Sequence, residues 1–474
     1  MKRKFLVIVL TIIFGFIPCF SFPSFKIWIL GWIGFVPLLF LFDEKHTTKN
    51  FIIGIFAGFI FHIFLLNWLF SVAGFFYILI AIYLSLYWAV FFCLVFAFPE
   101  KTRIILGASL WYFLEILMQN LLTGFPWLPL SLSQWSCPAT ARIASVYGSA
   151  GLSGLIMGTN IAFYNGIKNR RVFQSFVIIA VVMFSYLISI YTGISDNSST
   201  TIKIASIQGN SGYFGQSPEE SFEIYRNMTN SIKEKCNLVI WPESSYPSIL
   251  NKNPNVVDYL TQKSYIFPIL VGSLSQDNDT VYNSAYLFTR GSVFRYDKKH
   301  LVPFGEYVPG KRFRTIENLY TRFAGFMPDI SPGNKPGIFS IDSKKFLVLI
   351  CFENIFPSIT TASIDNDTGF IVVITNDSWY GNSFGPFQHF AHNVLRACET
   401  GRCVVQTAGT GITGIVSPYG DCKILEKNRK NLFIDGIMIS DISLSNMKTV
   451  YMFLQEIGIA IIFILLIGVV ICKN

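Results

Sequence analysis

The chain has 474 residues, of which 52% are hydrophobic and only 14% are charged, and its net charge is +9. Soluble proteins carry about 25% charged residues, so the composition excludes an ordinary soluble globular protein. The basic residues lie at the edges of apolar segments rather than in one patch. This arrangement argues against a nucleic-acid partner and favours anionic lipid headgroups.

The apolar residues gather in eight stretches, each near the roughly 20 residues that a helix needs to cross a bilayer. The first resembles a signal peptide, but it has no small-x-small cleavage site, so we expect an uncleaved helix. We place the eight membrane spans at 5–20, 26–42, 51–70, 74–98, 104–122, 147–167, 172–194 and 452–472.

The basic residues of the short loops orient these spans. Starting from a cytoplasmic N-terminus, the opposite short loops hold little beyond Lys26 and Arg142. By the positive-inside rule, both termini are expected in the cytoplasm and residues 195–450 outside it. The cytoplasmic side would then hold Lys2, Arg3, Lys4, Lys45, Lys49, Lys101, Arg103, Lys168, Arg170, Arg171 and Lys473.

The block after the polar linker SDNSSTT has the pattern of an α/β domain. Strands alternating with helices predict one domain with a mixed, buried sheet. A helix over 217–237 would begin at Ser217, with Glu220 in the capping-box position, and a second helix would cover 388–401. The expected strands are 201–209, 238–244, 267–275, 281–290, 292–297, 345–351 and 370–377.

The stretch 304–334 has no clear period and is rich in proline, glycine and aromatic residues. Long irregular loops in compact domains are usually lids or binding loops. Phe323, Phe326 and Met327 would make its tip apolar. A loop packed on its own domain and a lid that dips into lipid are both compatible with this composition.

Three residues with complementary chemistry lie at the ends of predicted strands: Glu243, Lys298 and Cys351. A helix start near Cys351 and the Lys298 ammonium would both favour its thiolate. Lys298 could also hold an oxyanion. Trp241 and Pro242 would keep water from Glu243, raising its pKa so that it could shuttle a proton. Such a set can open an ester or amide through a thioester, but each residue alone is usually core or solvated.

Motifs in order along the chain connect the three. WPES, the YDKKHLVPFGE segment, CFE and NDSWYG resemble the carbon–nitrogen hydrolase (nitrilase) superfamily. With the apolar segments on both sides, and with TGFPWLPL (123–130) and RACETGR (396–402), the chain is similar to the apolipoprotein N-acyltransferase family over nearly all of its residues.

The resemblance implies a four-layer αββα domain on a membrane-embedded helical bundle of about eight helices. Residues 1–194 would hold seven transmembrane helices, 195–450 the extracytoplasmic catalytic domain, and 451–474 the last transmembrane helix. It implies Glu243 as general base, Lys298 as electrostatic stabiliser and Cys351 as nucleophile, with Glu306 and Glu353 in supporting roles.

The chain departs from the family pattern at two places. Phe352 stands where the family often has tyrosine, so a hydroxyl is missing beside the nucleophile. The tryptophan expected shortly after Gln208 is also absent, and Tyr213 or Phe214 could replace it.

The reaction implied by the resemblance moves a fatty acyl chain from a phospholipid, typically phosphatidylethanolamine, to Cys351. The α-amino group of a diacylglyceryl-cysteine at an apolipoprotein N-terminus then takes the chain as an amide. The expected partners are therefore both lipidic. No metal or other cofactor is implied, and we expect a monomer in the bacterial inner membrane, with its catalytic domain on the periplasmic side.

Several other patterns point elsewhere and are weaker. GEYVPGKR (305–312) lacks the Ser or Thr of a phosphate loop, and GTGITG (409–414) precedes a strand rather than a helix. His389 and His392 lack a third metal ligand at suitable spacing, and no C-x-x-C pair is present. His62 and Glu115 lie in spans, where a functional role and an interhelical hydrogen bond are equal alternatives.

Three competing functions have different signatures. A membrane-tethered amidase or nitrilase would hydrolyse small substrates without forming a lipid thioester. A transporter would need ionisable residues along several spans and an inverted repeat; few such residues are present and no such repeat is obvious. A non-catalytic binding domain would not need the intact Glu, Lys and Cys.

Overall fold

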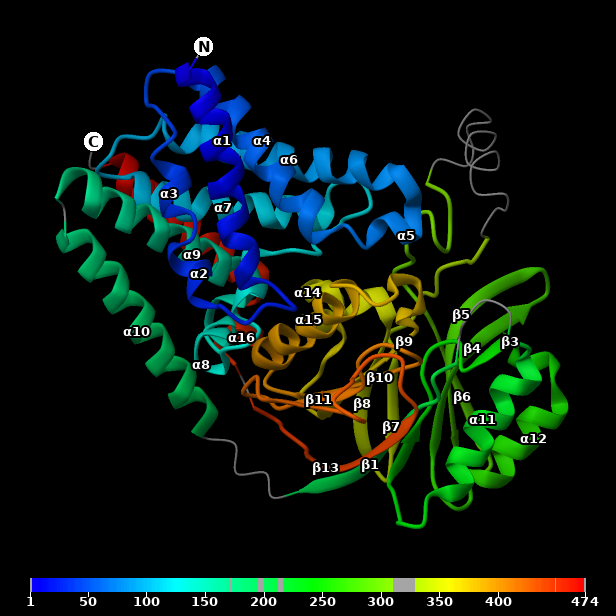
Figure 1. Cartoon of the computed structure of the whole chain (residues 1–474). Helices are drawn as coiled ribbons and strands as arrows, with labels where there is room; N and C mark the ends of the chain where they lie inside the picture. Colours follow the sequence, from blue (N-terminus) through cyan, green and yellow to red (C-terminus); the bar gives the residue numbers. More distant parts are fainter. Residues whose placement is uncertain are drawn as a thin grey trace.

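The structure is a computed structural model that describes residues 2–170, 172–194, 200–211, 216–309, 329–447 and 449–472. Two parts are visible in Figure 1: a group of apolar helices built from both ends of the chain, and an α/β part built from its middle. Tyr213, Phe214 and the predicted loop tip (Phe323, Phe326 and Met327) lie outside the described residues, so the two alternatives for the loop stay open.

The helical part contains long apolar helices. In the described residues, four segments are long and apolar enough to cross a membrane: Lys4–Ser21, Thr47–Leu65, Leu69–Val95 and Phe173–Tyr191. The helices are α1 (Lys2–Phe16), α2 (Ile29–Ile33), α3 (Val36–Leu39), α4 (Thr47–Leu65), α5 (Leu69–Ala73), α6 (Tyr77–Val95), α7 (Arg103–Asn120), α8 (Pro138–Ala141), α9 (Ala144–Asn169), α10 (Val172–Ile194) and α16 (Val450–Cys472).

The predicted span over 26–42 is shorter in the structure, where the apolar helical segment covers Ile29–Leu39. This stretch forms the two short helices α2 and α3, and Gly34 ends the first of them. Pro37 stands in the first turn of α3, a position that proline tolerates because its missing N–H would be unpaired there anyway. The other predicted spans correspond to helices, although α9 is kinked at Gly148 and α16 at Gln455.

Small residues let the helices approach one another closely. A Cβ atom on Gly54 of α4 would lie 2.9 Å from Cα of Ala89 on α6, and one on Gly154 of α9 would lie 2.7 Å from the carbonyl oxygen of Ala108 on α7. Neither helix pair could keep this separation with a larger residue. Such contacts are typical of helix packing in membranes, where the hydrophobic effect does not hold helices together.

The predicted single sheet is also wrong, because the described strands divide over two mixed sheets. The first has the order β13-β1-β2-β4-β5-β6, with β3 beside β4, and the second has the order β12-β11-β10-β9-β8-β7. The strands are β1 (Thr201–Gln208), β2 (Leu238–Ile240), β3 (Tyr246–Ile249), β4 (Ile269–Asp277), β5 (Thr280–Thr289), β6 (Ser292–Asp297), β7 (Ile338–Ile341), β8 (Lys344–Ile350), β9 (Thr368–Thr375), β10 (Cys403–Ala408), β11 (Gly414–Val416), β12 (Cys422–Ile424) and β13 (Gly436–Ser443).

Alternation along β8 shows how the two sheets are stacked. Phe346, Val348 and Ile350 belong to the core between the sheets, together with residues of β1, β2, β4 and β5. Leu347 and Leu349 belong to a separate core on the other face. Since side chains of a strand point alternately to opposite faces, the sheet is buried on both sides, and its strands therefore read as continuous apolar runs.

Helices cover the outer faces of both sheets and complete the four-layer αββα arrangement that the resemblance implies. On the first sheet lie α11 (Pro218–Ser231) and α12 (Pro254–Lys263), and on the second lie α14 (Pro357–Ser363) and α15 (Gly385–Thr400). The predicted capping box is present, with Ser217 accepting from the backbone N–H of Glu220. Figure 1 shows α14 and α15 between the sheets and the apolar helices.

α15 joins the two parts of the molecule through buried polar contacts. The side-chain oxygen of Gln388 accepts hydrogen bonds from the indole N–H groups of Trp68 and Trp127, both at 2.9 Å. At the other end of α15, Arg396 pairs with Glu399 at 2.7 Å, and Glu399 accepts from the backbone N–H of Ser149 on α9. Buried polar groups of this kind fix one relative arrangement, because leaving them unpaired is costly.

Candidate active site

Glu243, Lys298 and Cys351 all lie beyond strand ends at one edge of the stacked sheets. Lys298 directly follows β6, Cys351 directly follows β8, and Glu243 comes three residues after β2. β2 and β6 run in the same direction, because β2 is parallel to β4 while β4–β5 and β5–β6 are antiparallel. Their carboxyl ends therefore meet at one edge, as the sequence predicts for an α/β site.

Lys298 lies between two carboxylates in the interior. Its side chain is only 1% exposed, and Nζ is 3.0 Å from Oε1 of Glu306 and 3.6 Å from Oε1 of Glu243. Burial lowers the pKa of Lys298, but the carboxylates of Glu306 and Glu243 outweigh burial, so that the pKa lies above its ordinary value. The lysine is therefore a fixed cation.

Glu243 is held by hydrogen bonds on both oxygens. Oε1 accepts from the side-chain amide of Asn283 at 2.7 Å, and Oε2 accepts from the backbone N–H of Asn376 at 2.7 Å. Gly272 of β4 leaves room for this segment, since a Cβ atom there would lie 2.5 Å from Cα of Glu243. Burial raises the pKa of Glu243 against the opposing charge of Lys298, in the direction that the sequence predicts.

Cys351 directly follows β8 and has a backbone conformation that a non-glycine residue seldom adopts. Its φ is +52°, and a 3-10 helix, η5 (Cys351–Ile355), begins at this residue. Left-handed backbone costs free energy and persists where the surroundings hold it in place, often at functional sites. The turn brings the thiol to the sheet edge that also carries Glu243 and Lys298.

The prediction that the surroundings of Cys351 favour its thiolate is wrong, because their net effect raises the pKa of the thiol. The residue is 6% exposed. Burial raises the pKa of the thiol well above its ordinary value, and the negative charge of Glu243 raises it further, while Lys298 lowers it as expected. The short helix η5 does not reverse this outcome. The free thiol therefore stays protonated, and a base must remove its proton as the sulfur attacks.

Glu306 is half-buried and Glu353 is fully buried next to this group, and their surroundings differ. Glu306 accepts from Lys298 and Asn283 through Oε1 and from the backbone N–H of Val302 through Oε2. It is therefore part of the charged cluster. Glu353 instead accepts four hydrogen bonds that tie the end of β6 to the turn at Cys351, from the Tyr296 hydroxyl and from the backbone N–H groups of Lys299, His300 and Ile350.

Phe352 has an aromatic environment. Its ring centroid lies 6.2 Å from those of Phe125 and Trp127 and 5.2 Å from that of Phe356. Phe125 and Trp127 belong to the TGFPWLPL segment, so the residue after the nucleophile contacts the helical part of the chain. Packing of this ring against its neighbours needs no hydroxyl.

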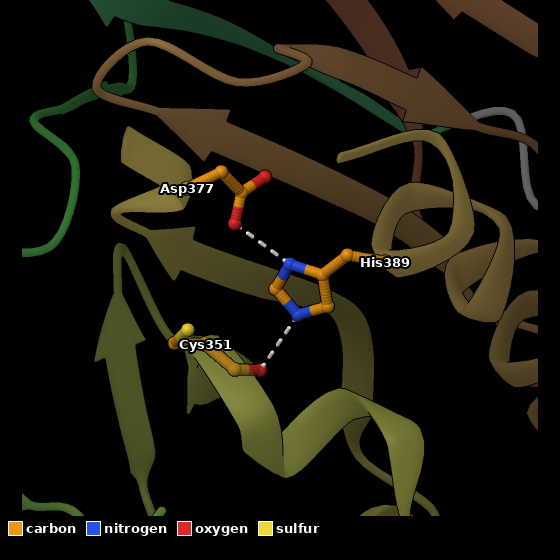
Figure 2. Close-up of side chains that lie close together, drawn as sticks. All are labelled: Cys351, Asp377 and His389. Carbon is orange, nitrogen blue, oxygen red and sulfur yellow. Dashed lines mark hydrogen bonds and ion pairs between the residues drawn. The ribbon is translucent and has the colours of Figure 1, made fainter. Parts of the chain in front are cut away.

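Asp377 and His389 are the site residues that the sequence did not connect. His389 Nδ1 is 2.8 Å from Oδ1 of Asp377, and Nε2 is 3.2 Å from the backbone oxygen of Cys351 (Figure 2). Asp377 lies in the NDSWYG motif directly after β9, the parallel neighbour of β8. The sequence signal for Asp377 was its position as a polar residue after a buried strand, β9, that lies beside β8. Nothing in the spacing indicated that His389 would contact Asp377.

The remaining motifs have structural explanations. The glycines of GTGITG form the turn between antiparallel β10 and β11, as expected. Glu115 accepts hydrogen bonds from Trp111 and from the backbone N–H of Leu130, which favours the structural alternative. His62 bonds the carbonyl oxygen of Gly58 within its own helix. GEYVPGKR extends into residues that the structure does not describe.

Comparison with known proteins agrees with this architecture. Residues 203–451 match the carbon-nitrogen hydrolase family, and residues 14–162 match the family described as apolipoprotein N-acyltransferase N-terminal domain. Among solved structures, a CN-hydrolase superfamily protein from Xanthomonas campestris is 15% identical, with a TM-score of 0.39, over 52% of this chain and 91% of that chain. The match over residues 203–451 alone identifies the middle of the chain as a carbon–nitrogen hydrolase domain.

Curated relatives match both domains together. The apolipoprotein N-acyltransferase of Geobacter metallireducens is 30% identical, over 95% of this chain and 91% of that protein. The enzyme of the same name from Wigglesworthia glossinidia brevipalpis is 30% identical, over 87% of this chain and 88% of that protein. The chain belongs to the apolipoprotein N-acyltransferase family.

Proposed function

We propose that the chain transfers a fatty acyl chain from a phospholipid to the α-amino group of the N-terminal diacylglyceryl-cysteine of apolipoproteins, through a thioester on Cys351. Membership in the family along both domains supports the N-acylation of apolipoproteins. The observation that carries the chemical route is the buried Lys298–Glu243 pair, 3.6 Å apart, at the sheet edge where Cys351 follows β8.

In the first half of the reaction, the Cys351 sulfur attacks the ester carbonyl while Glu243 takes the thiol proton. The negative charge that develops on the carbonyl oxygen faces the fixed cation of Lys298. Collapse of the tetrahedral intermediate breaks the ester C–O bond. Glu243 then returns its proton to the leaving alkoxide, which departs as a lyso-phospholipid and leaves the acyl chain on sulfur.

In the second half, the amine of the lipoprotein N-terminus attacks the thioester. Glu243 accepts a proton from the nitrogen, the C–S bond breaks, and the proton passes to the released sulfur. The product is an amide, and the thiol is regenerated. Water must be kept from the thioester, since hydrolysis would make the enzyme a lipase.

The proposal can be tested in vesicles that contain the purified full-length chain, a phospholipid of one defined acyl length and a diacylglyceryl-cysteine lipopeptide. We expect lyso-phospholipid and N-acylated lipopeptide in equal amounts, and the lyso-phospholipid alone, in one burst per enzyme, when the lipopeptide is left out. Hydrolysis of small amides without transfer to the lipopeptide would instead favour the amidase alternative.

The pH dependence of the burst follows from the two raised pKa values. Glu243 must be ionised to act as the base, so the burst rate should rise with pH through a pKa above the ordinary carboxyl value of 4.5. It should then level off rather than follow ionisation of the thiol, whose pKa is raised well beyond this range. Stopped-flow release of a fluorescent lyso-phospholipid measures this profile. A rate that keeps rising with thiol ionisation would contradict Glu243 as the base.

Glu306→Gln should slow the reaction less than loss of a reacting group. The glutamine oxygen can still accept one of the hydrogen bonds from Lys298 and Asn283, but the negative charge beside Lys298 is lost. We expect a fall of about 10- to 100-fold in turnover. Glu234→Gln, at an exposed pair with Lys203, serves as the matched control with unchanged turnover. Equal turnover in both variants would remove Glu306 from the site.

Four of the described segments are long and apolar enough to cross a bilayer, which supports the proposal of a membrane enzyme. We propose eight crossings, with residues 1–194 as membrane domain, 195–450 as catalytic domain on the periplasmic side of the bacterial inner membrane, and 451–474 as the last crossing. Both termini would lie in the cytoplasm. Protease added to spheroplasts should cleave a site inserted at exposed Asn278 of the β4–β5 turn, whereas tags at either end should remain intact.

We further propose phosphatidylethanolamine as the preferred acyl donor and a monomer as the active form. Vesicles of phosphatidylethanolamine and of phosphatidylglycerol with the same acyl chains compare the donors directly. Equal burst rates would argue against a headgroup preference. Mass measurement of the enzyme in nanodiscs decides the oligomeric state, and a dimer would overturn the second proposal.

A further inference from the structure

A fully buried pair of side chains, Asp377 and His389, lies next to the carbonyl group of Cys351. Asp377 and His389 are both 0% exposed, and their closest atoms, Oδ1 and Nδ1, are 2.8 Å apart. The other ring nitrogen of His389, Nε2, is 3.2 Å from the Cys351 oxygen. The three residues come from three elements: the start of η5, the start of η6 (Asp377–Tyr380) and the first half of α15.

Hydrogen-bond accounting assigns one proton of this pair. Oδ1 of Asp377 accepts a hydrogen bond from the Thr375 hydroxyl at 2.7 Å as well as facing His389 Nδ1. A backbone carbonyl oxygen can only accept. Nε2 of His389 must therefore donate to the carbonyl oxygen of Cys351, while Nδ1 is paired with Asp377.

The ring is aimed at the backbone of the nucleophile and not at its sulfur. Figure 2 shows the carbonyl oxygen of Cys351, rather than its sulfur, facing Nε2. His389 therefore does not have the geometry of a base that activates the thiol. The possible metal-ligand atoms of Cys351, Asp377 and His389 lie within 4.8 Å of one another, but both ring nitrogens of His389 already have hydrogen-bond partners.

The contact falls on the residue whose backbone is strained. Cys351 has a φ of +52°, and such a conformation persists only where neighbours hold it. The ring is itself fixed, since it stacks on Trp127 with centroids 5.7 Å apart and planes inclined by 21°.

We propose that His389, held in place by Asp377, is a positioning residue that keeps the peptide of Cys351 in the left-handed turn and so aims the thiol at the acyl donor. The inference rests on the proposed function, because it concerns the rate at which Cys351 is acylated. It predicts that the hydrogen bond to the Cys351 carbonyl matters for this rate, whereas the presence of the ring does not.

Two amide substitutions separate the two hydrogen bonds of the ring. In His389→Gln the amide nitrogen can take the place of Nε2 and still donate to Cys351. In His389→Asn it can take the place of Nδ1 and donate only to Asp377. Both variants remove the ring, so a merely structural role predicts equal effects. His392→Gln, three residues along the same helix, keeps its donor to the Trp127 carbonyl and is the matched control.

The readout is the burst rate of lyso-phospholipid release from vesicles by the full-length enzyme, with the rate of Cys351 alkylation by iodoacetamide measured in parallel. A misplaced nucleophile costs about 100-fold, and we expect a loss of this size for His389→Asn, a loss below tenfold for His389→Gln, and little change for His392→Gln. The phospholipid KM should stay the same, and the alkylation rates should fall in the same order.

Equal burst rates for the two folded His389 variants would overturn the inference, as would a wild-type rate for His389→Asn. If either His389 variant fails to fold, the inference is tested by the alkylation rates of the other His389 variant and of Asp377→Asn. Wild-type alkylation rates in these two variants would again overturn the inference. Failure of the proposed function has a different signature: the wild-type enzyme would then give no burst, while the order of the alkylation rates could still be measured.

Discussion

Replacing Cys351 with alanine should abolish both thioester formation and amide formation. The acyl chain has no other atom to occupy in the proposed route, so we expect a loss on the order of 10⁴-fold or more, comparable to loss of the nucleophile in other covalent enzymes. The fold should survive, because alanine fits the space of the thiol and tolerates the left-handed turn about as well as cysteine does. Catalysis and folding are therefore separable at this position.

The measurement is mass spectrometry of lipoprotein N-termini in a bacterial strain depleted of its own enzyme and complemented with each variant. Wild type should give N-acylated termini, and Cys351→Ala should give diacylated termini with a free amine. Cys403→Ala is the matched control, since Cys403 is also a buried thiol in the same domain but lies at the start of β10. N-acylated termini from the Cys351→Ala protein would contradict the proposed route.

Replacing Lys298 with methionine should damage both catalysis and stability. Loss of a group that stabilises an oxyanion costs about 10²- to 10³-fold. Removing the lysine also leaves Glu243 and Glu306 bound to one Asn283 side chain without a cation between them. Breaking a buried ion pair in this way typically costs about 3–5 kcal/mol of stability. Because Lys298 is only 1% exposed, solvent does not screen its charge.

The stability loss should depend on pH with a definite sign. Lys298 lowers the pKa of Glu243, so its removal raises that pKa further above the value in the unfolded chain. A carboxyl group with a raised pKa is least unfavourable when protonated, and its cost grows as pH rises through the folded pKa. Thermal unfolding should therefore show a larger gap between Lys298→Met and wild type at pH 8 than at pH 5.

The neighbouring lysine supplies the control. Lys299 has an exposed side chain, and only its backbone N–H contacts the site, through Glu353. Lys299→Met should therefore keep the wild-type unfolding temperature and turnover. If Lys299→Met were the more damaging substitution, the assignment of Lys298 from the Y-x-K pattern would be wrong.

Local features of the fold were predictable where a short pattern determines them. Ser217 and Glu220 specify a helix start by themselves, and β8 is recognisable as an apolar run with a cysteine at its end. The division into two sheets was not predictable from single strands, since each buried strand has the same apolar appearance in either sheet. β13 shows why: it pairs with β1 although more than 200 residues separate them.

The position of Glu243, Lys298 and Cys351 at strand ends was predictable, but their electrostatics were not. The residues beyond β2, β6 and β8 could be identified because chemistry at strand ends follows a general rule. The direction of the Cys351 pKa shift could not be predicted, because it depends on burial by residues from the rest of the chain and on the Glu243 charge. Asn283, Asp377 and His389 were missed for the same reason, since only tertiary structure brings them to the nucleophile.

The central claim is that acyl groups pass through the sulfur of Cys351. It is tested most directly by quenching the wild-type enzyme in acid shortly after mixing with a phospholipid of one acyl length, and mapping the acyl mass by peptide sequencing. The account predicts that mass on Cys351 alone, and its disappearance when a diacylglyceryl-cysteine lipopeptide is added before the quench. An acyl mass on any other residue, or one on Cys351 that the lipopeptide does not remove, would contradict it.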